Sequence, residues 1–199
     1  SGDTDPRAIA MQESAKQEFG LNGSTTAHFG RGKNLDEGEN LSLGDKGRRA
    51  FLRAQYNETQ AFFAEHNITH VTLFRGVVHQ ETLLPLSQKS GVGEVTMSPL
   101  SSFSFSVDTA LEFTQGGPSS SNAMHVLAAR VPVSKILSTS RTGFGCSREA
   151  EMVVLGGTYR LRVAQVSRDA ITSPSVAASA LKLQVPKLYG PAPKGAREP

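Results

Sequence analysis

The spacing of apolar residues along the chain predicts three helices. Between Asp45 and His66, apolar side chains recur at intervals of three and four residues, which is typical of an amphipathic helix. The positions expected to face the interior are Ala50, Phe51, Ala54, Ala61, Phe62 and Phe63. The positions expected to face water are Arg48, Arg49, Arg53, Glu58 and Glu65. Shorter helices are predicted over residues 8–19 and 107–114, and the second would pack through Ala110, Leu111 and Phe113.

Runs of β-branched and aromatic residues predict the strands. The clearest runs cover residues 69–78, 123–133 and 159–166, and another extends from Glu151 to Leu155. Residues 94–100 are followed by the serine-rich stretch of residues 101–106. In the second of these, strict alternation would place Ser102, Ser104 and Ser106 on one face, and Phe103 and Phe105 on the other.

The two ends of the chain have the composition of irregular structure. Residues 20–44 are rich in small polar residues, and Ala, Pro, Lys and Gly dominate after Pro174. We therefore expect a flexible or partly helical segment over residues 1–44, one domain over residues 45–174, and a tail over residues 175–199. The tail is predicted to be helical over residues 175–183 and disordered at its end.

Composition narrows the class of protein. A length of 199 residues with 38% hydrophobic and 20% charged residues is typical of a globular domain with one core. No apolar run approaches the length of a membrane-spanning helix, and no signal peptide opens the chain. The opening Ser1-Gly2 is typical of a cloning remnant, so an upstream leader or domain outside this sequence stays open.

The cysteine count excludes two structural features, and the charge gives little information on its own. Cys146 is the only cysteine, which rules out an internal disulfide and a zinc site built from cysteines. The formal net charge of +3 and the pI of about 9.2 are too small to predict a nucleic-acid-binding protein on their own.

Two carboxylates stand two residues apart where the apolar run ending at Leu155 begins. In a strand such residues point to the same face, so Glu149 and Glu151 would project side by side. Like charges this close repel each other, which favours a functional role. The alternative is an exposed strand edge whose charges prevent aggregation. The preceding residues 142–147 contain two glycines and are expected to form a mobile turn.

A single arginine interrupts the apolar strand predicted over residues 69–78. Arg75 would be costly there unless it meets an anion. Gly76, next to it, would let a ligand or another backbone come close. The alternative is a structural salt bridge to Glu149 or Glu151.

Along the chain, an arginine on a strand, a row of serines and a pair of glutamates follow one another. In this order they resemble the Arg / Ser-Thr-Ser / Glu-x-Glu class of mono-ADP-ribosyltransferases, which includes bacterial toxins and vertebrate arginine transferases. The resemblance covers residues 51–166. The family's arginine falls on Arg75, its serine motif on Ser102-Phe103-Ser104, and its last motif on Glu149-Ala150-Glu151. Phe103 replaces the usual threonine, and a shifted register that uses Ser101 or Ser106 is the alternative.

The resemblance implies an α+β fold of two small antiparallel sheets packed as a sandwich, with flanking helices and an NAD cleft. It implies NAD as co-substrate and no metal. Glu151 would stabilise the positive charge that develops on the ribose as nicotinamide leaves, and Ser102 would hold Glu151 in place. Arg75 would bind the diphosphate or ribose of NAD, and Gly76 and Ser104 would complete the NAD-binding set.

On the acceptor side, the resemblance assigns Glu149 to orient or deprotonate the nucleophile, which a glutamate at this position implies to be a protein arginine. Residues 140–148 match the family's substrate-recognition turn. Within it, Phe144 would either swing out to contact the target or anchor the loop. The alternatives are an NAD glycohydrolase that uses water, a transferase that modifies nucleic acid, and an inactive binding module of the same fold.

The likeness to toxins implies a biological setting as well. It implies a secreted or delivered effector that acts in the cytoplasm of a target cell, on a protein of a host or competitor cell. An immunity protein would be a further partner, whereas no membrane partner is expected.

Overall fold

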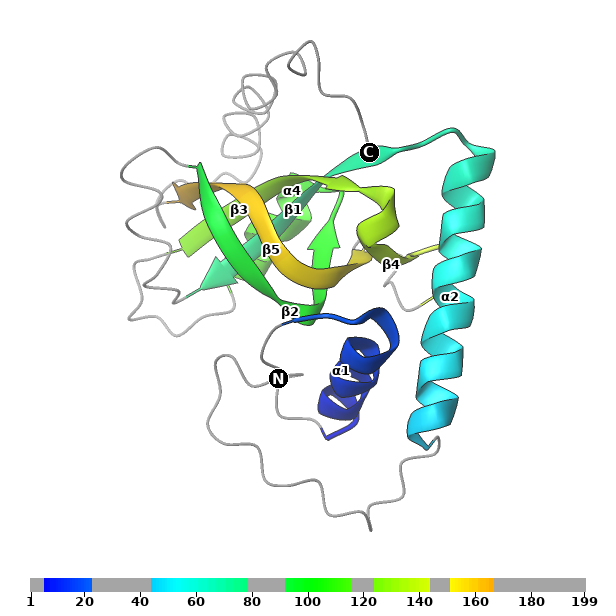
Figure 1. The fold of residues 1–199 in the computed structure, drawn as a ribbon. Helices are drawn as coiled ribbons and strands as arrows, with labels where there is room; N and C mark the ends of the chain where they lie inside the picture. Colours follow the sequence, from blue (N-terminus) through cyan, green and yellow to red (C-terminus); the bar gives the residue numbers. More distant parts are fainter. Residues whose placement is uncertain (1–5, 23–43, 79–91, 116–123, 144–150, 167–199) are drawn as a thin grey trace. The chain divides into compact units, whose positions relative to one another are not determined.

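The computed structural model describes residues 6–22, 44–78, 92–115, 124–143 and 151–166 of the chain. The helices within these ranges are α1 (Pro6–Phe19), α2 (Asp45–Glu65) and α4 (Val107–Gln115), with a short 3-10 helix η3 (Val133–Lys135). The strands are β1 (His70–Val78), β2 (Val92–Ser104), β3 (Met124–Pro132), β4 (Ile136–Thr139) and β5 (Glu151–Val166), as Figure 1 shows. None of the described helices has both the length and the apolar character that crossing a membrane requires.

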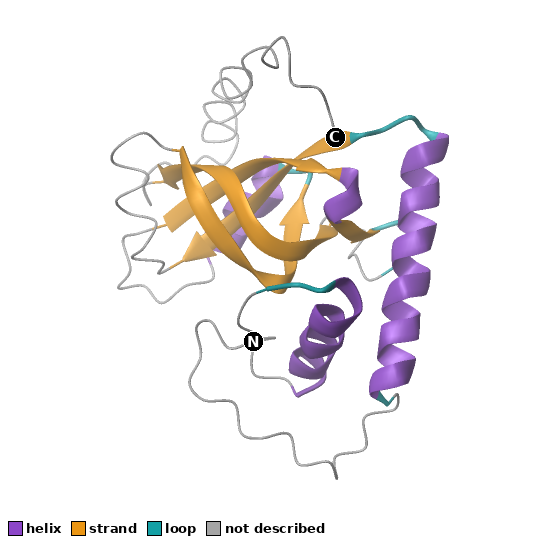
Figure 2. Cartoon of the chain, viewed as in Figure 1, coloured by secondary structure: helices purple, strands orange, loops and turns teal. Residues whose placement is uncertain are grey.

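The described strands join in a five-stranded sheet of order β2-β1-β3-β5-β4, in which β2 also pairs with β5 (Figure 2). The long strand β5 runs antiparallel to β3, with Met124 opposite Val166, and antiparallel to β4, with Thr139 opposite Met152. Helices together with an antiparallel sheet confirm the α+β class. The two-sheet sandwich and the NAD cleft stay predictions.

The chain divides into two compact units, and each unit has its own core. Unit 1 comprises Ser1–Leu73, Glu94–Phe105 and Ala129–Leu161, and unit 2 comprises Phe74–Gly93, Ser106–Ala128 and Arg162–Pro199. The core of unit 1 is built from Ala15, Leu52, Leu137, Val153 and Leu155. The core of unit 2 is built from Phe74, Val107, Ala110, Leu111 and Val126. This division does not test the domain boundaries predicted at residues 44 and 174, which stay predictions.

The buried face of α2 differs from the predicted one. Of the six positions expected to face inward, Phe63 is buried, whereas Phe51 is 41% exposed and the three alanines are also exposed. The buried residues are Leu52, Gln55, Thr59 and Phe63, which follow one another at helical spacing. The prediction was wrong because it treated α2 as an isolated amphipathic helix, while a second helix covers the side that carries its arginines.

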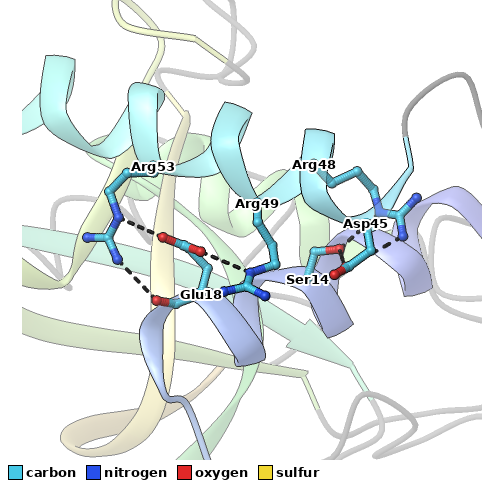
Figure 3. Close-up of polar contacts among 6 residues, drawn as sticks. All are labelled: Ser14, Glu18, Asp45, Arg48, Arg49 and Arg53. Carbon is cyan, nitrogen blue, oxygen red and sulfur yellow. Dashed lines mark hydrogen bonds and ion pairs between the residues drawn. The ribbon is translucent and has the colours of Figure 1, made fainter.

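That second helix is α1, and its polar contacts with α2 are drawn in Figure 3. Glu18 accepts hydrogen bonds from Arg49 Nε at 3.0 Å and from Arg53 Nε at 2.8 Å. The guanidinium of Arg53 also lies over the ring of Phe19, 4.7 Å from its centroid. The two arginine side chains predicted to face water are therefore used to hold α1 against α2.

A second set of contacts, one turn away, involves a buried hydroxyl. Ser14 is fully buried, and its hydroxyl donates to Asp45 Oδ1 at 2.7 Å (Figure 3). Arg48 Nε donates to the same hydroxyl at 2.9 Å. Because a buried hydroxyl is costly without partners, these two bonds fix how α1 lies along α2.

Two further predictions about the middle of the chain were wrong. The strand β2 runs through Pro99 and ends at Ser104. Since β2 ends there, the alternation predicted as far as Ser106 is lost: Ser104 is 4% exposed, whereas Phe105 is 47% exposed. In α4, Ala110 and Leu111 are buried as predicted, but Phe113 is 55% exposed.

The contacts of Glu18 give a testable pH dependence. The hydrogen bonds from Arg53 and Arg49 lower the pKa of Glu18 below its ordinary value of 4.5. A depressed carboxyl pKa stabilises the fold above pH 4.5, and this contribution is lost as the pH falls through the lowered pKa. We expect Glu18→Gln to lower the free energy of unfolding at pH 7 by about 1 kcal/mol. Denaturant unfolding at pH 7 and again below pH 4.5 measures this difference.

The matched control is Glu13→Gln on the same helix, where the carboxylate is more exposed and lies 3.7 Å from Lys16. This control should change the unfolding free energy less. Equal effects of the two substitutions at pH 7, or a Glu18→Gln effect that persists unchanged in acid, would contradict the account.

Candidate active site

The candidate site is organised by the pairing of β2 with β5 inside unit 1. The hydroxyls of Thr96 and Thr158 lie 3.1 Å apart across the two strands. Further along, a Cβ built on Gly156 would lie 2.7 Å from Pro99 Cα and 2.7 Å from the carbonyl oxygen of Ser98. As the residue number rises on β2 it falls on β5, so the two strands run antiparallel.

The serine motif and the last carboxylate lie on these two paired strands. Ser102 lies near the end of β2 and Glu151 is the first residue of β5. Ser102 is exposed and Glu151 is half-buried, so both side chains reach a surface of unit 1.

The two serines that offered a shifted register have other tasks. Ser101 is 2% exposed, and its hydroxyl donates to the carbonyl of Ser98 at 3.2 Å. Ser106 caps α4: its hydroxyl accepts from the backbone N–H of Thr109 at 3.2 Å. Both hydroxyls are engaged in local structure, and this favours Ser102 as the serine of the site. Ser104 is buried.

The arginine of the first motif lies in unit 2. Arg75 and Gly76 follow Phe74, a core residue of that unit, on β1, and both are half-buried. An arginine that is half-buried on a strand is costly unless it meets an anion or another acceptor. Ser102 and Glu151 thus lie on paired strands of unit 1, and Arg75 lies in unit 2.

Two predicted site residues, Phe144 and Glu149, lie outside the described residues. The mobile turn predicted over residues 142–147 is described for its first two residues. Thr142 and Gly143 both donate their backbone N–H groups to the carbonyl of Thr139, each at 3.2 Å. These two residues belong to a hydrogen-bonded turn, and the mobility expected for residues 142–147 stays a prediction.

This turn contacts α2 through residues that sequence reasoning missed. The hydroxyls of Thr59 and Thr142 lie 2.7 Å apart. Thr59 is fully buried, and Gln55, one turn earlier on α2, packs against Gly143. The only available signal was two polar residues at helical spacing between Leu52 and Phe63.

Two other titratable side chains, those of His125 and Tyr159, have structural roles. His125 is fully buried on β3, and burial lowers its pKa below 6.5, so it is an uncharged core residue at neutral pH. Burial raises the pKa of Tyr159 to about 12, and its hydroxyl donates to the carbonyl of Leu155 within β5. Among the described parts of the chain, no three His, Cys, Asp or Glu side chains gather as metal ligands would.

Comparison with protein families gives the class of this protein, which is an ADP-ribosyltransferase. Residues 51–163 match the model of the family described as dinitrogenase reductase ADP-ribosyltransferase, which is more than half of the 199 residues. The chain belongs to this family. The matched region contains Arg75, Ser102 and Glu151. No curated protein and no solved structure matches the chain.

The family gives the coarse activity. ADP-ribosyltransferases use NAD as co-substrate and transfer its ADP-ribose group, and this family indicates transfer of single ADP-ribose units. The match begins at Phe51, so α1 and the first residues of α2 lie before it. The α1 side of the α1–α2 contacts therefore lies before the matched region, whereas Arg53 on α2 lies within it.

The close approach at Gly156 provides a test of the site's framework. We expect Gly156→Ala to lower the free energy of unfolding by about 1–3 kcal/mol, because the added methyl group would collide with the backbone of β2. NAD turnover should fall as well, since the collision forces β2 away from β5 near the candidate site. Denaturant unfolding and nicotinamide release measure the two effects.

Gly44→Ala is the matched control, because a Cβ on Gly44 meets no atom within 4 Å. Gly44 is the N-cap residue of α2, where alanine is less favourable than glycine, so this control should lower the stability only slightly and leave the turnover unchanged. If Gly156→Ala were as harmless as Gly44→Ala, β2 and β5 would not pair as described.

Proposed function

We propose that this protein is a mono-ADP-ribosyltransferase that splits NAD and transfers ADP-ribose to an arginine side chain of a protein. The observation that supports the proposal is the pairing of β2 with β5, the two strands on which Ser102 and Glu151 lie. Family membership gives the transferase chemistry. The acceptor and the residue roles are the proposed part.

Splitting NAD needs negative charge beside the ribose. As the bond from ribose to nicotinamide breaks, positive charge develops on the sugar, and a fixed carboxylate that accepts a hydrogen bond from a ribose hydroxyl stabilises this charge. Glu151 is half-buried at the start of a strand that pairs on both sides, so its backbone is held firmly. Ser102 on the neighbouring strand would orient its carboxylate.

The diphosphate of NAD needs a cation, and Arg75 has the chemistry to provide it. A guanidinium forms paired, charge-assisted hydrogen bonds with phosphate oxygens. Arg75 is half-buried, and the next residue, Gly76, has no side chain that would keep a ligand from the backbone. These donors and acceptors suit a nucleotide substrate: a cation for the diphosphate, and a hydroxyl and a carboxylate for the ribose.

On the acceptor side, Glu149 would orient the incoming guanidinium and take up its proton, as the Glu-x-Glu motif implies. The family's name gives a protein, dinitrogenase reductase, as the acceptor for that family. This supports a protein acceptor here in preference to nucleic acid or water. We propose that Phe144, next to this motif, contacts the acceptor protein.

The biological setting follows less directly. The motifs resemble those of toxins, which supports an effector delivered to a host or competitor cell and paired with an immunity protein. The family name instead gives dinitrogenase reductase as the modified protein. Identifying the labelled protein in extracts of the producing cell and of other cells would distinguish the two settings.

The role of Glu151 can be tested directly. We expect Glu151→Gln to lower nicotinamide release by about 100-fold or more, because the neutral amide cannot stabilise the charge on the ribose. Incubation with NAD, followed by assays for nicotinamide and for a labelled peptide, measures this. Two peptides that differ by an arginine-to-lysine replacement would report the acceptor, and the arginine peptide should be labelled.

Glu94→Gln is the control, since Glu94 is an exposed glutamate near the other end of β2. It should retain full turnover. Undiminished nicotinamide release by the Glu151→Gln protein would overturn the proposed function, and equal labelling of both peptides would overturn the choice of arginine.

A further inference from the structure

The buried face of α2 contains two polar residues, and both contact the turn that follows β4. Thr59 is fully buried and Gln55 is 7% exposed. A buried hydroxyl is costly unless it is hydrogen-bonded. The partner of Thr59 is the hydroxyl of Thr142, 2.7 Å away, at a sequence distance of 83 residues. This pair links α2 to the turn.

Thr142 is the centre of a small hydroxyl network with Thr139. Its hydroxyl accepts the backbone N–H of Thr139 at 3.0 Å and lies 3.2 Å from the hydroxyl of Thr139. The Thr139 hydroxyl in turn accepts the backbone N–H groups of Arg141 at 3.1 Å and Thr142 at 3.2 Å. Side chain and backbone together therefore give the turn one conformation.

Gly143, the last described residue of the turn, also lies against α2. A Cβ built on Gly143 would be 1.5 Å from Nε2 and 2.6 Å from Cδ of Gln55. The absence of a side chain thus lets the backbone approach Gln55 closely. The turn is held to α2 at two successive points, Thr142 on Thr59 and Gly143 on Gln55.

The position of this turn gives the network its significance. Thr139 pairs with Met152, the residue that follows Glu151 on β5. Along the chain, the turn ends where the segment carrying Phe144 and Glu149 begins. The network therefore contacts the strand that begins with Glu151, and it precedes the segment that carries the proposed acceptor-side residues.

The two sides of the reaction depend on this network unequally. Glu151 is held by strand pairing, because β5 pairs with β4 and with β2. The turn is held to α2 through the Thr59 hydroxyl and the packing on Gln55. Loss of the hydroxyl should therefore disturb the start of the acceptor segment more than it disturbs Glu151.

We propose that Thr59, Thr139 and Thr142 are positioning residues for acceptor recognition, and that α2 fixes the acceptor side of the site through them. The proposal rests on the proposed transferase function and adds residues outside the three sequence motifs. It assigns α2 a role in the choice between transfer to a protein arginine and hydrolysis by water.

The test compares transfer with hydrolysis in Thr59→Val, which keeps the shape of the side chain and removes its hydroxyl. ADP-ribose transfer to an arginine peptide and nicotinamide release without the peptide are measured on the full chain. We expect the ratio of transfer to hydrolysis to fall roughly tenfold, as expected for loss of one buried hydrogen bond. The KM for NAD should change little, and Thr59→Ser should restore the ratio.

The control for general loosening of α2 is Gln60→Met. Gln60 Nε2 donates to the carbonyls of Val133 and Ile136, each at 3.0 Å, so this variant weakens α2 on β4 away from the turn. Its ratio should stay that of the unmodified chain. If Thr59→Val does not fold, Thr142→Val removes the same hydroxyl pair from the turn and is expected to lower the ratio similarly.

An unchanged ratio in both valine variants would overturn the inference while leaving the transferase function in place. An equal fall in Gln60→Met would also overturn it, because general loosening would then explain the effect. An unmodified chain that releases no nicotinamide from NAD would instead overturn the proposed function, and the inference with it.

Discussion

The close backbone contact between β2 and β5 is the constraint on which the proposed site depends. At Gly156 the two strands approach so closely that a single methyl group would meet the backbone of Pro99. This approach belongs to the pairing of β2 with β5, in which the hydroxyls of Thr96 and Thr158 also meet. Ser102 and Glu151, which are distant in the sequence, thereby lie on neighbouring strands of one sheet.

Helix α2 supports this site from within the same unit, and its two sides use different chemistry. Toward α1 it presents arginines that bind Glu18 and Ser14. Toward the turn after β4 it presents Gln55 and the Thr59 hydroxyl. Each such contact contributes on the order of 1 kcal/mol or less. Because these contacts depend on direction, we infer that they determine how the elements align more than they determine stability.

Periodicity in the sequence predicted where most elements lie, but not which side of α2 is buried. The helix over residues 45–66 and the strand over 69–78 agree with α2 and β1 within a residue. The wrong face was predicted because arginine side chains normally face water. The sequence of α2 alone does not indicate that its three arginines bind Glu18 and Ser14 on α1. Thr59 was missed for the same reason: its partner Thr142 is remote in sequence.

The candidate site shows the same limit. The order of the motifs identified Arg75, Ser102 and Glu151, and these residues lie within the family match. The choice among neighbouring serines could not be made from the sequence, since Ser101 and Ser106 are distinguished by a buried bond to Ser98 and by capping of α4. Tertiary contacts favour Ser102 among these serines, whereas the proposed roles of Glu149 and Phe144 rest on their motif.

The central claim is that Ser102 and Glu151 act as one unit in splitting NAD. A double-mutant cycle on nicotinamide release, with Ser102→Ala, Glu151→Gln and the double variant, tests it most directly. If Ser102 works by holding Glu151, its substitution should slow the native enzyme but cost almost nothing once Glu151 is already replaced. If the two effects on the activation free energy simply added, the two residues would act independently, and the account of this site would be contradicted.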